Sequence, residues 1–164
     1  MRCVVLRILQ GTALALLVSA CSGHVSRIEK AENGFVYERI FNDMGGHVRN
    51  EYAAWTARQQ AHGITHYVID GTCASFCSFV ALTSPRSCYT KSARLGLHPA
   101  SIGGVMETAE TRRLTAHLVS LWPQGLRDWW AANRPSVLGH DLVYADLKRI
   151  IPERECSSQL QAAR

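Results

Sequence analysis

The chain has 164 residues and a formal net charge of +5 at pH 7. Its lysines and arginines are scattered among acidic residues, without a basic run or an aromatic-interleaved stripe, which argues against nucleic-acid binding. The length suits one compact domain with its own core and is too short for two.

The first twenty residues have the pattern of an export signal. Arg2 and Arg7 precede an apolar run over residues 8–18, which is too short to span a bilayer as a mature helix. The run ends in LVSAC at residues 17–21, which resembles a bacterial lipobox with Cys21 as the acylated first residue. Secretory cleavage at the same bond without acylation is the alternative. Either cut removes two arginines, leaves about 144 residues with a charge of +3, and places the protein in the periplasm.

Four cysteines remain when Cys3 and the proposed lipid anchor are set aside: Cys73, Cys77, Cys88 and Cys156. An even number in an oxidising compartment favours disulfides, and four cysteines allow three connectivities between which the sequence does not choose. Zinc bound by Cys73, Cys77, Cys88 and His98 is the alternative, but C-x3-C-x10-C-x9-H is not a usual zinc spacing. We therefore predict no metal and no cofactor.

Along the chain, residues 21–33 are polar and are predicted to be a tether, followed by a domain over 34–156 and a tail over 157–164. Hydrophobic alternation and short apolar runs predict strands over 35–41, 64–69, 88–90 and 94–98. Turn residues stand at 42–46 and 70–72. Helical periodicity and capping residues predict helices over 48–63, 74–82, 105–121, 124–133 and 142–150. This order predicts an α/β domain with crossover helices between largely parallel strands.

Two predicted strand-to-helix junctions carry residues suited to chemistry. Loops at such junctions expose backbone N–H groups and helix N-termini. Asp43-Met44-Gly45-Gly46 forms the first junction, and Gly71-Thr72-Cys73-Ala74-Ser75-Phe76 forms the second. Ser75 can act as a nucleophile if a base takes its proton and N–H groups hold the oxyanion. The predicted oxyanion donors are the amides of Phe76 and of Gly45 or Gly46. A small residue that eases helix packing is the alternative role for this serine.

His98 is the candidate base. It closes the apolar run Arg94-Leu95-Gly96-Leu97, and Pro99 ends the strand after it. A histidine at this place would project from a sheet edge into a cleft, whereas the alternative is an ordinary packed or surface histidine.

Taken together, these pieces resemble the proteolytic subunit of Clp protease and its relatives in the crotonase-like superfamily. The shared pieces are Gly45-Gly46, then Gly71-x-x-Ala74-Ser75, then His98-Pro99, with intervals of 29 residues from Gly46 to Ser75 and 23 from Ser75 to His98. The cysteine-flanked serine and the run RLGLHP are similar to small exported Clp-like proteins of bacteria. The resemblance covers roughly residues 35–105.

The resemblance implies a crotonase-like fold with a mostly parallel sheet and a serine peptidase whose third catalytic residue is an acid. Asp141 and Asp146 stand at suitable separations, and either is equally an ordinary helix-end carboxylate. Met44 stands where the family usually has proline, and Cys73 stands where it usually has a small residue.

The expected function is that of a membrane-anchored serine peptidase acting on peptides or unfolded segments. No ATPase partner is expected, because ATP-driven unfoldases work in the cytosol, while a second copy of the chain is an open candidate partner. The alternative is a non-catalytic envelope lipoprotein that uses the fold for binding or assembly. A thiol redox or metal protein is the third class.

Acylation at Cys21 is the first testable expectation. Bacterial cells grown with a labelled fatty acid should yield a labelled protein, and Cys21→Ser should lose the label and accumulate as precursor. A soluble, unlabelled wild-type protein would contradict the lipobox interpretation.

Overall fold

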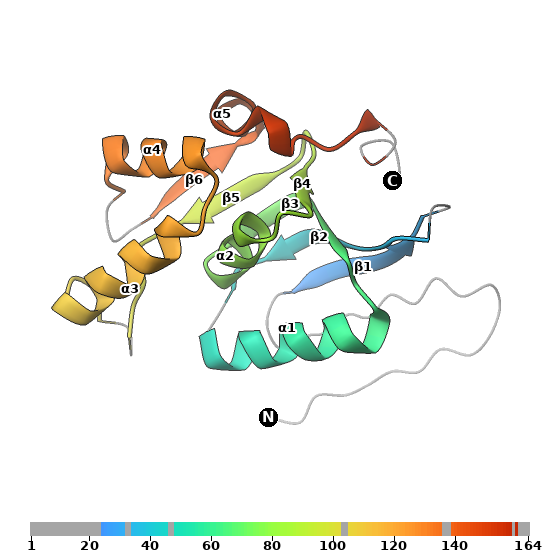
Figure 1. Ribbon diagram of the computed structural model, residues 1–164, viewed down its shortest axis with the longest axis horizontal. Coiled ribbons are helices and arrows are strands. Elements are labelled where there is room, and N and C mark those ends of the chain that lie inside the picture. The colour runs from blue at the N-terminus through green and yellow to red at the C-terminus, as the bar shows by residue number, and fades with distance from the viewer. Residues whose placement is uncertain are drawn as a thin grey trace.

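The computed structural model describes residues 24–31, 34–45, 48–102, 105–135, 139–158 and 160, with the backbone alone at 48–50. In this part of the chain, helices pack against one mixed sheet (Figure 1). The six strands are β1 Val25–Lys30, β2 Val36–Asp43, β3 His66–Ala74, β4 Ser87–Tyr89, β5 Arg94–Leu97 and β6 His140–Val143.

The sheet has the strand order β1-β2-β3-β5-β6, and β4 also pairs with β3. β3 is parallel to β2, to β4 along its first half and to β5 along its second half. The two outer pairings, β1 with β2 and β5 with β6, are antiparallel. The predicted mostly parallel, crotonase-like sheet is therefore wrong, because antiparallel strands form both ends of this sheet.

Neither of these outer strands was predicted. β1 lies within residues 21–33, where a polar tether was expected, and it pairs along its length with β2. Its sequence, VSRIEK, is largely polar because Ser26 and Glu29 meet charged side chains of β2, while Ile28 packs against the apolar core. β6 has four residues, and its last two fall within the helix predicted over 142–150. The predicted tail also contacts the domain, since the Leu160 carbonyl accepts a hydrogen bond of 2.8 Å from Arg39 Nη2.

The helices agree more closely with the sequence pattern. They are α1 Val48–His62, α2 Phe76–Thr83, α3 Ala109–Ser120, α4 Gln124–Asn133 and α5 Tyr144–Ile150, followed by the 3-10 turn Pro152–Arg154. α1 ends at Gly63, whose φ of 62° suits a glycine C-cap. α3 begins later than predicted because Thr108 caps it, accepting from the Thr111 amide. Leu121, which follows α3, is 48% exposed, and the next residue, Trp122, is buried.

The turn predicted at residues 70–72 is absent because β3 continues straight to Ala74. The glycine there has another purpose. A Cβ on Gly71 would lie 2.0 Å from the Phe41 carbonyl oxygen, at the place where β2 bulges between Ile40 and Asn42. Gly71 therefore allows the bulge to pack against β3.

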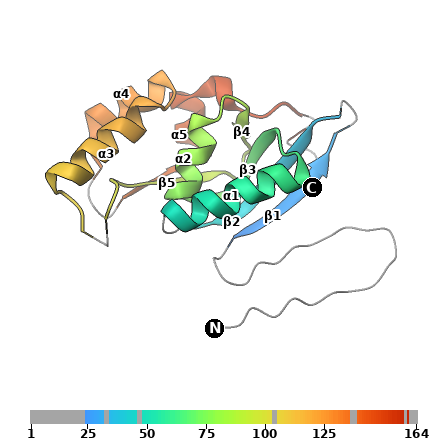
Figure 2. The same cartoon turned by 60° about the horizontal axis from the view of Figure 1, so that its bottom comes forward.

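One large apolar core joins the sheet to its helices. α1 and α2 lie over the same face (Figure 2), where Trp55 and Val80 line a common hollow with Ile40 of β2. Trp122, Leu126 and Leu147 extend this core under the C-terminal helices.

Among the described residues, no helix is both long enough and apolar enough to cross a bilayer.

Both disulfides are resolved, and the prediction that the four cysteines are oxidised is confirmed. Cys73 at the end of β3 pairs with Cys77 in the first turn of α2, and Cys88 of β4 pairs with Cys156 near the C-terminus. No cysteine in the described part of the chain is free. Because these thiols are paired with one another, the zinc alternative has lost its ligands.

The two disulfides should stabilise the fold unequally. Their cysteines are 4 and 68 residues apart in the sequence. In the chain-entropy account, the longer loop contributes about 4 kcal/mol and the shorter one about 2 kcal/mol. Denaturant unfolding should therefore show that the double variant Cys88→Ser, Cys156→Ser loses more unfolding free energy than the double variant Cys73→Ser, Cys77→Ser. An equal or reversed order would contradict this ranking.

Candidate active site

Ser75 stands at the turn between β3 and α2 in an unusual backbone conformation. Its φ is 56° and its ψ is −123°, a combination that non-glycine residues rarely adopt. The Ser75 amide donates to the Gly96 carbonyl oxygen at 3.1 Å, and its own carbonyl accepts from Phe79 at 3.1 Å. A sharp, strained strand-to-helix turn of this kind is how hydrolases expose a serine hydroxyl. Ser75 is partly exposed, although its neighbours Ala74 and Phe76 are buried.

The glycine junction packs directly on this turn. Gly45 has a φ of 66°, and a Cβ there would lie 2.6 Å from Ser75 Cβ, 2.7 Å from the Ala74 oxygen and 2.8 Å from the Phe76 nitrogen. Only glycine fits such a position. The structure thus brings together Gly45, Ser75 and Phe76.

The predicted oxyanion donors differ in whether their N–H groups already have an acceptor. The Gly45 amide donates to Asp43 Oδ1 at 2.7 Å, so it is already occupied. Gly46 lies outside the described residues. Phe76 is the first residue of α2, where backbone N–H groups lack intrahelical acceptors, so its amide remains a suitable donor.

His98 follows β5 and is partly buried. Its Nδ1 lies 2.8 Å from the Pro99 carbonyl oxygen. A carbonyl can only accept, so the hydrogen of the neutral ring is on Nδ1 and the lone pair is on Nε2. This is the tautomer that a general base needs when Nε2 faces the proton to be removed.

Gly96 links the three predicted catalytic residues. It accepts from the Ser75 amide, stands two residues before His98, and is the register partner of Asp141. A Cβ on Gly96 would lie 2.7 Å from Ala74 Cβ and 3.3 Å from Asp141 Oδ1. The ends of β3, β5 and β6 therefore meet closely at this residue.

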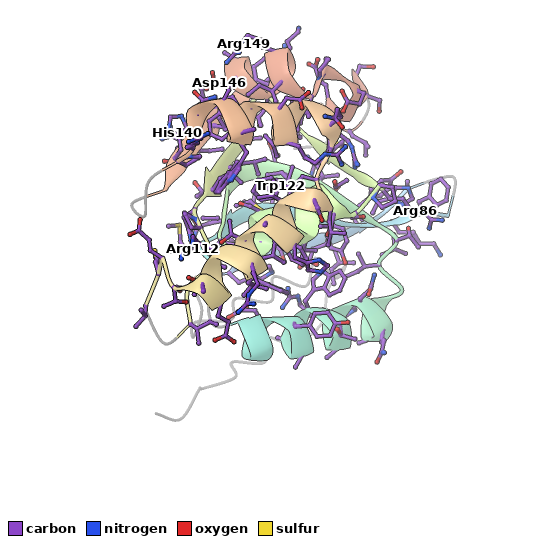
Figure 3. The ribbon with its side chains drawn as sticks, turned by 60° about the vertical axis from the view of Figure 1, so that its left-hand side comes forward. Arg86, Arg112, Trp122, His140, Asp146 and Arg149 are labelled. Carbon is purple, nitrogen blue, oxygen red and sulfur yellow. A yellow bond between two sulfur atoms is a disulfide. The ribbon has the colours of Figure 1, made fainter. Side chains whose placement is uncertain are left out.

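The two candidate acids occupy different places. Asp141 is exposed and is the β6 partner of Gly96, two residues before His98. Asp146 accepts from the Val143 amide at 3.3 Å and lies 3.4 Å from Arg149 Nη2. Figure 3 shows Asp146 and Arg149 together on α5. Asp146 thus acts as a helix-end carboxylate, the alternative role anticipated for it.

The side chains of the candidate nucleophile, base and acid are not joined by hydrogen bonds. Among the described residues, Ser75 Oγ, His98 and Asp141 make no side-chain hydrogen bond with one another. Geometry tight enough for proton transfer would require these side chains to move toward each other, which is common between free and substrate-bound enzymes.

Sequence reasoning missed a buried charged cluster beside the glycine junction. His24, placed in the tether by its sequence position, is only 7% exposed. Its Nδ1 lies 2.7 Å from Asp43 Oδ2, and its Nε2 lies 3.0 Å from Glu38 Oε1 and 2.8 Å from Ser26 Oγ. The sequence signal available for this cluster was Asp43, which stands two residues before Gly45.

The charges in this cluster shift two pKa values. Burial lowers the pKa of His24, but the hydrogen bonds to Asp43 and Glu38 outweigh burial and raise it to about 9. Burial raises the pKa of Glu38, but the hydrogen bond from His24 and the charge of Arg58 outweigh it and hold that pKa below its usual value. His24 is therefore an imidazolium between two carboxylates at neutral pH.

A small hollow adjoins this cluster on the side of α1 and α2. Its walls are the apolar side chains of Ile40, Trp55, Phe76 and Val80, together with Cys77 and the charged groups of Glu38, Asp43, Glu51 and Arg58. Phe76 and Asp43 connect it to the Ser75 turn, so the turn has a partly polar recess behind it.

The chain matches no protein-family model and no curated protein sequence.

The raised pKa of His24 predicts a specific dependence of stability on pH. A folded pKa above the unfolded value of 6.5 gives stability that is fully present below pH 6.5 and is lost as pH rises to about 9. Wild type should thus exceed His24→Gln in unfolding free energy by up to about 3 kcal/mol near pH 6. That difference should shrink toward pH 9–10. Chemical denaturation across pH 6–10 measures it, with exposed His62→Gln as the control, and a constant difference would contradict the assignment.

Proposed function

We propose that the mature chain is a periplasmic, membrane-anchored serine hydrolase, a peptidase that works without an ATPase, with Ser75 as nucleophile and His98 as general base. The backbone of Ser75 carries the proposal. A left-handed φ at a serine costs of order 1–3 kcal/mol, and residues in such strained conformations cluster at active sites. The turn that imposes it is held by Gly45, by the Gly96 carbonyl and by the Cys73–Cys77 disulfide.

The chemistry follows acyl transfer. Ser75 Oγ attacks the scissile carbonyl carbon while His98 Nε2 takes the hydroxyl proton. Pro99 supports the resulting imidazolium, since its carbonyl oxygen already accepts the Nδ1 hydrogen. The Phe76 N–H, at the start of α2, donates to the oxyanion. His98 then gives its proton to the leaving amine, and water releases the acyl group by the reverse sequence.

The Pro99 carbonyl could take over part of the role that the acid has in a catalytic triad. In a triad, the acid holds the histidine in the right tautomer and stabilises its charged form. A backbone carbonyl at 2.8 Å performs the first task and contributes a dipole toward the second. Asp141 remains the candidate acid because it lies across from Gly96 on the neighbouring strand.

The export and anchoring parts of the proposal rest on the N-terminal pattern, and two disulfides fit an oxidising compartment. The likeness to exported Clp-like proteins is proposed on the order of the glycine pair, Ser75 and His98 alone, since the sheet differs from the predicted one. Peptides or unfolded segments that enter unaided are the proposed substrates.

A non-catalytic envelope lipoprotein is the second candidate. The observation in its favour is the open arrangement of the side chains, in which His98 is hydrogen-bonded to Pro99 and, within the described residues, to neither Ser75 nor Asp141.

A fluorophosphonate probe distinguishes the two candidates. Wild-type protein should be labelled covalently at Ser75, and Ser75→Ala and His98→Ala should each abolish labelling without lowering the melting temperature by more than a few degrees. The double variant should be no worse than either single variant, because the residues act as a unit. Exposed Ser101→Ala and His62→Ala serve as matched controls. Wild-type protein that is folded, disulfide-bonded and unlabelled would favour the non-catalytic role.

A further inference from the structure

We propose that Asp43 and His24 are a positioning pair for Ser75: the Asp43 carboxylate fixes the Gly45 turn against the serine, and His24 fixes the carboxylate. This inference rests on the proposed function, because it assigns the pair a part in the same reaction. Neither residue would touch the substrate in this role.

The first link joins Asp43 to the glycine turn. Asp43 is the last residue of β2 and is 7% exposed. Its Oδ1 accepts the Gly45 amide two residues ahead at 2.7 Å, a side-chain-to-backbone bond that defines a tight turn. The left-handed φ of 66° at Gly45 belongs to the same turn.

The second link joins the turn to the reacting group. Gly45 packs so closely that an added Cβ would fall within 2.8 Å of Ser75, Ala74 and Phe76 atoms. A substrate carbonyl must reach Ser75 Oγ and the Phe76 amide at about 3 Å, so it must fit beside Gly45. A displacement of the turn by about 1 Å would be expected to cost about a hundredfold in rate.

The third link is His24, which holds the other oxygen of the carboxylate. Both ring nitrogens lie within 3.0 Å of carboxylate oxygens, Asp43 Oδ2 and Glu38 Oε1. Carboxylates only accept, so both nitrogens donate and the ring is charged. The groups facing it are Asp43 and Glu38 of β2, Ser26 of β1, and Arg58 of α1 beyond Glu38. Loss of the ring proton would remove a charge-assisted bond to Asp43.

A second buried ion pair on the same sheet serves as a control, because its loss should lower stability without changing the position of the Gly45 turn. Arg39 Nη1 lies 3.1 Å from Asp70 Oδ2, and both residues are buried. Arg39 follows Glu38 in β2, so this pair lies on the other face of the sheet from His24. Its disruption should destabilise the fold without moving the Gly45 turn.

The test measures the rate of covalent labelling by the fluorophosphonate probe in full-length, oxidised protein well below its melting temperature. Asp43→Ala should lower the rate about tenfold or more. Asp43→Asn keeps an acceptor oxygen for Gly45 and should recover part of that loss. Asp70→Asn should melt earlier yet label at the wild-type rate.

The pH profile provides the second readout. After correction for probe hydrolysis, wild-type labelling should fall as pH rises through about 9, where His24 loses its proton. His24→Gln should show a lower rate without this fall. Labelling of Asp43→Ala at the wild-type rate, or a high-pH fall that persists in His24→Gln, would overturn the positioning role and leave the proposed function standing. Labelling in Ser75→Ala at the wild-type rate would instead overturn the proposed function and this inference with it.

Discussion

The left-handed backbone of Ser75 is the constraint that the rest of the site depends on. A conformation this costly persists only where the surroundings hold it from several sides. Here two backbone hydrogen bonds fix the residue, and a disulfide joins the positions two before and two after it. Gly45 leaves room beside Ser75, and Gly96 leaves room beside Ala74. Ser75 follows the central strand β3, Gly45 follows the neighbouring strand β2, and Gly96 lies in β5 on the other side. The arrangement of the sheet and the conformation of one residue are thus coupled.

The sheet also separates two buried charged groups on its opposite faces. Glu38 and Arg39 are adjacent in β2, so their side chains point in opposite directions, and each is almost completely buried. Buried charges need partners, and β1 with the preceding His24 supplies some of them, beside Arg58 for Glu38 and Asp70 for Arg39. His24 and Ser26 reach Glu38 on one face, while Glu29 reaches Arg39 on the other. β1 is therefore held by its backbone pairing with β2, and its Glu29 adds an ion pair with Arg39.

This role explains which parts of the structure could be predicted. Helices such as α4 and the inner strands follow from apolar periodicity, because their side chains enter a core. β1 has no such pattern, since Ile28 packs on the core while Ser26 and Glu29 meet charged groups, and β6 has four residues, too few for a period to show. The proximity of Gly45 and Ser75 could be foreseen because strand ends meet at one edge of an α/β sheet. The pairing of His24 with Asp43 joins residues 19 apart and depends on the register of an unpredicted strand, so no local pattern carried it.

The burial of His24 also bears on how the protein would sit at a membrane. Only two residues separate His24 from Cys21, the proposed attachment point for lipid. A free tether over residues 21–33 could hold the domain about 40 Å from the bilayer. With His24 locked into the sheet, the attachment point lies within about 11 Å of it. An acylated protein would then lie directly on the headgroups, with the Ser75 turn close to them. Under the proposed function, polypeptide emerging from the lipid surface would meet this turn sooner than polypeptide diffusing freely.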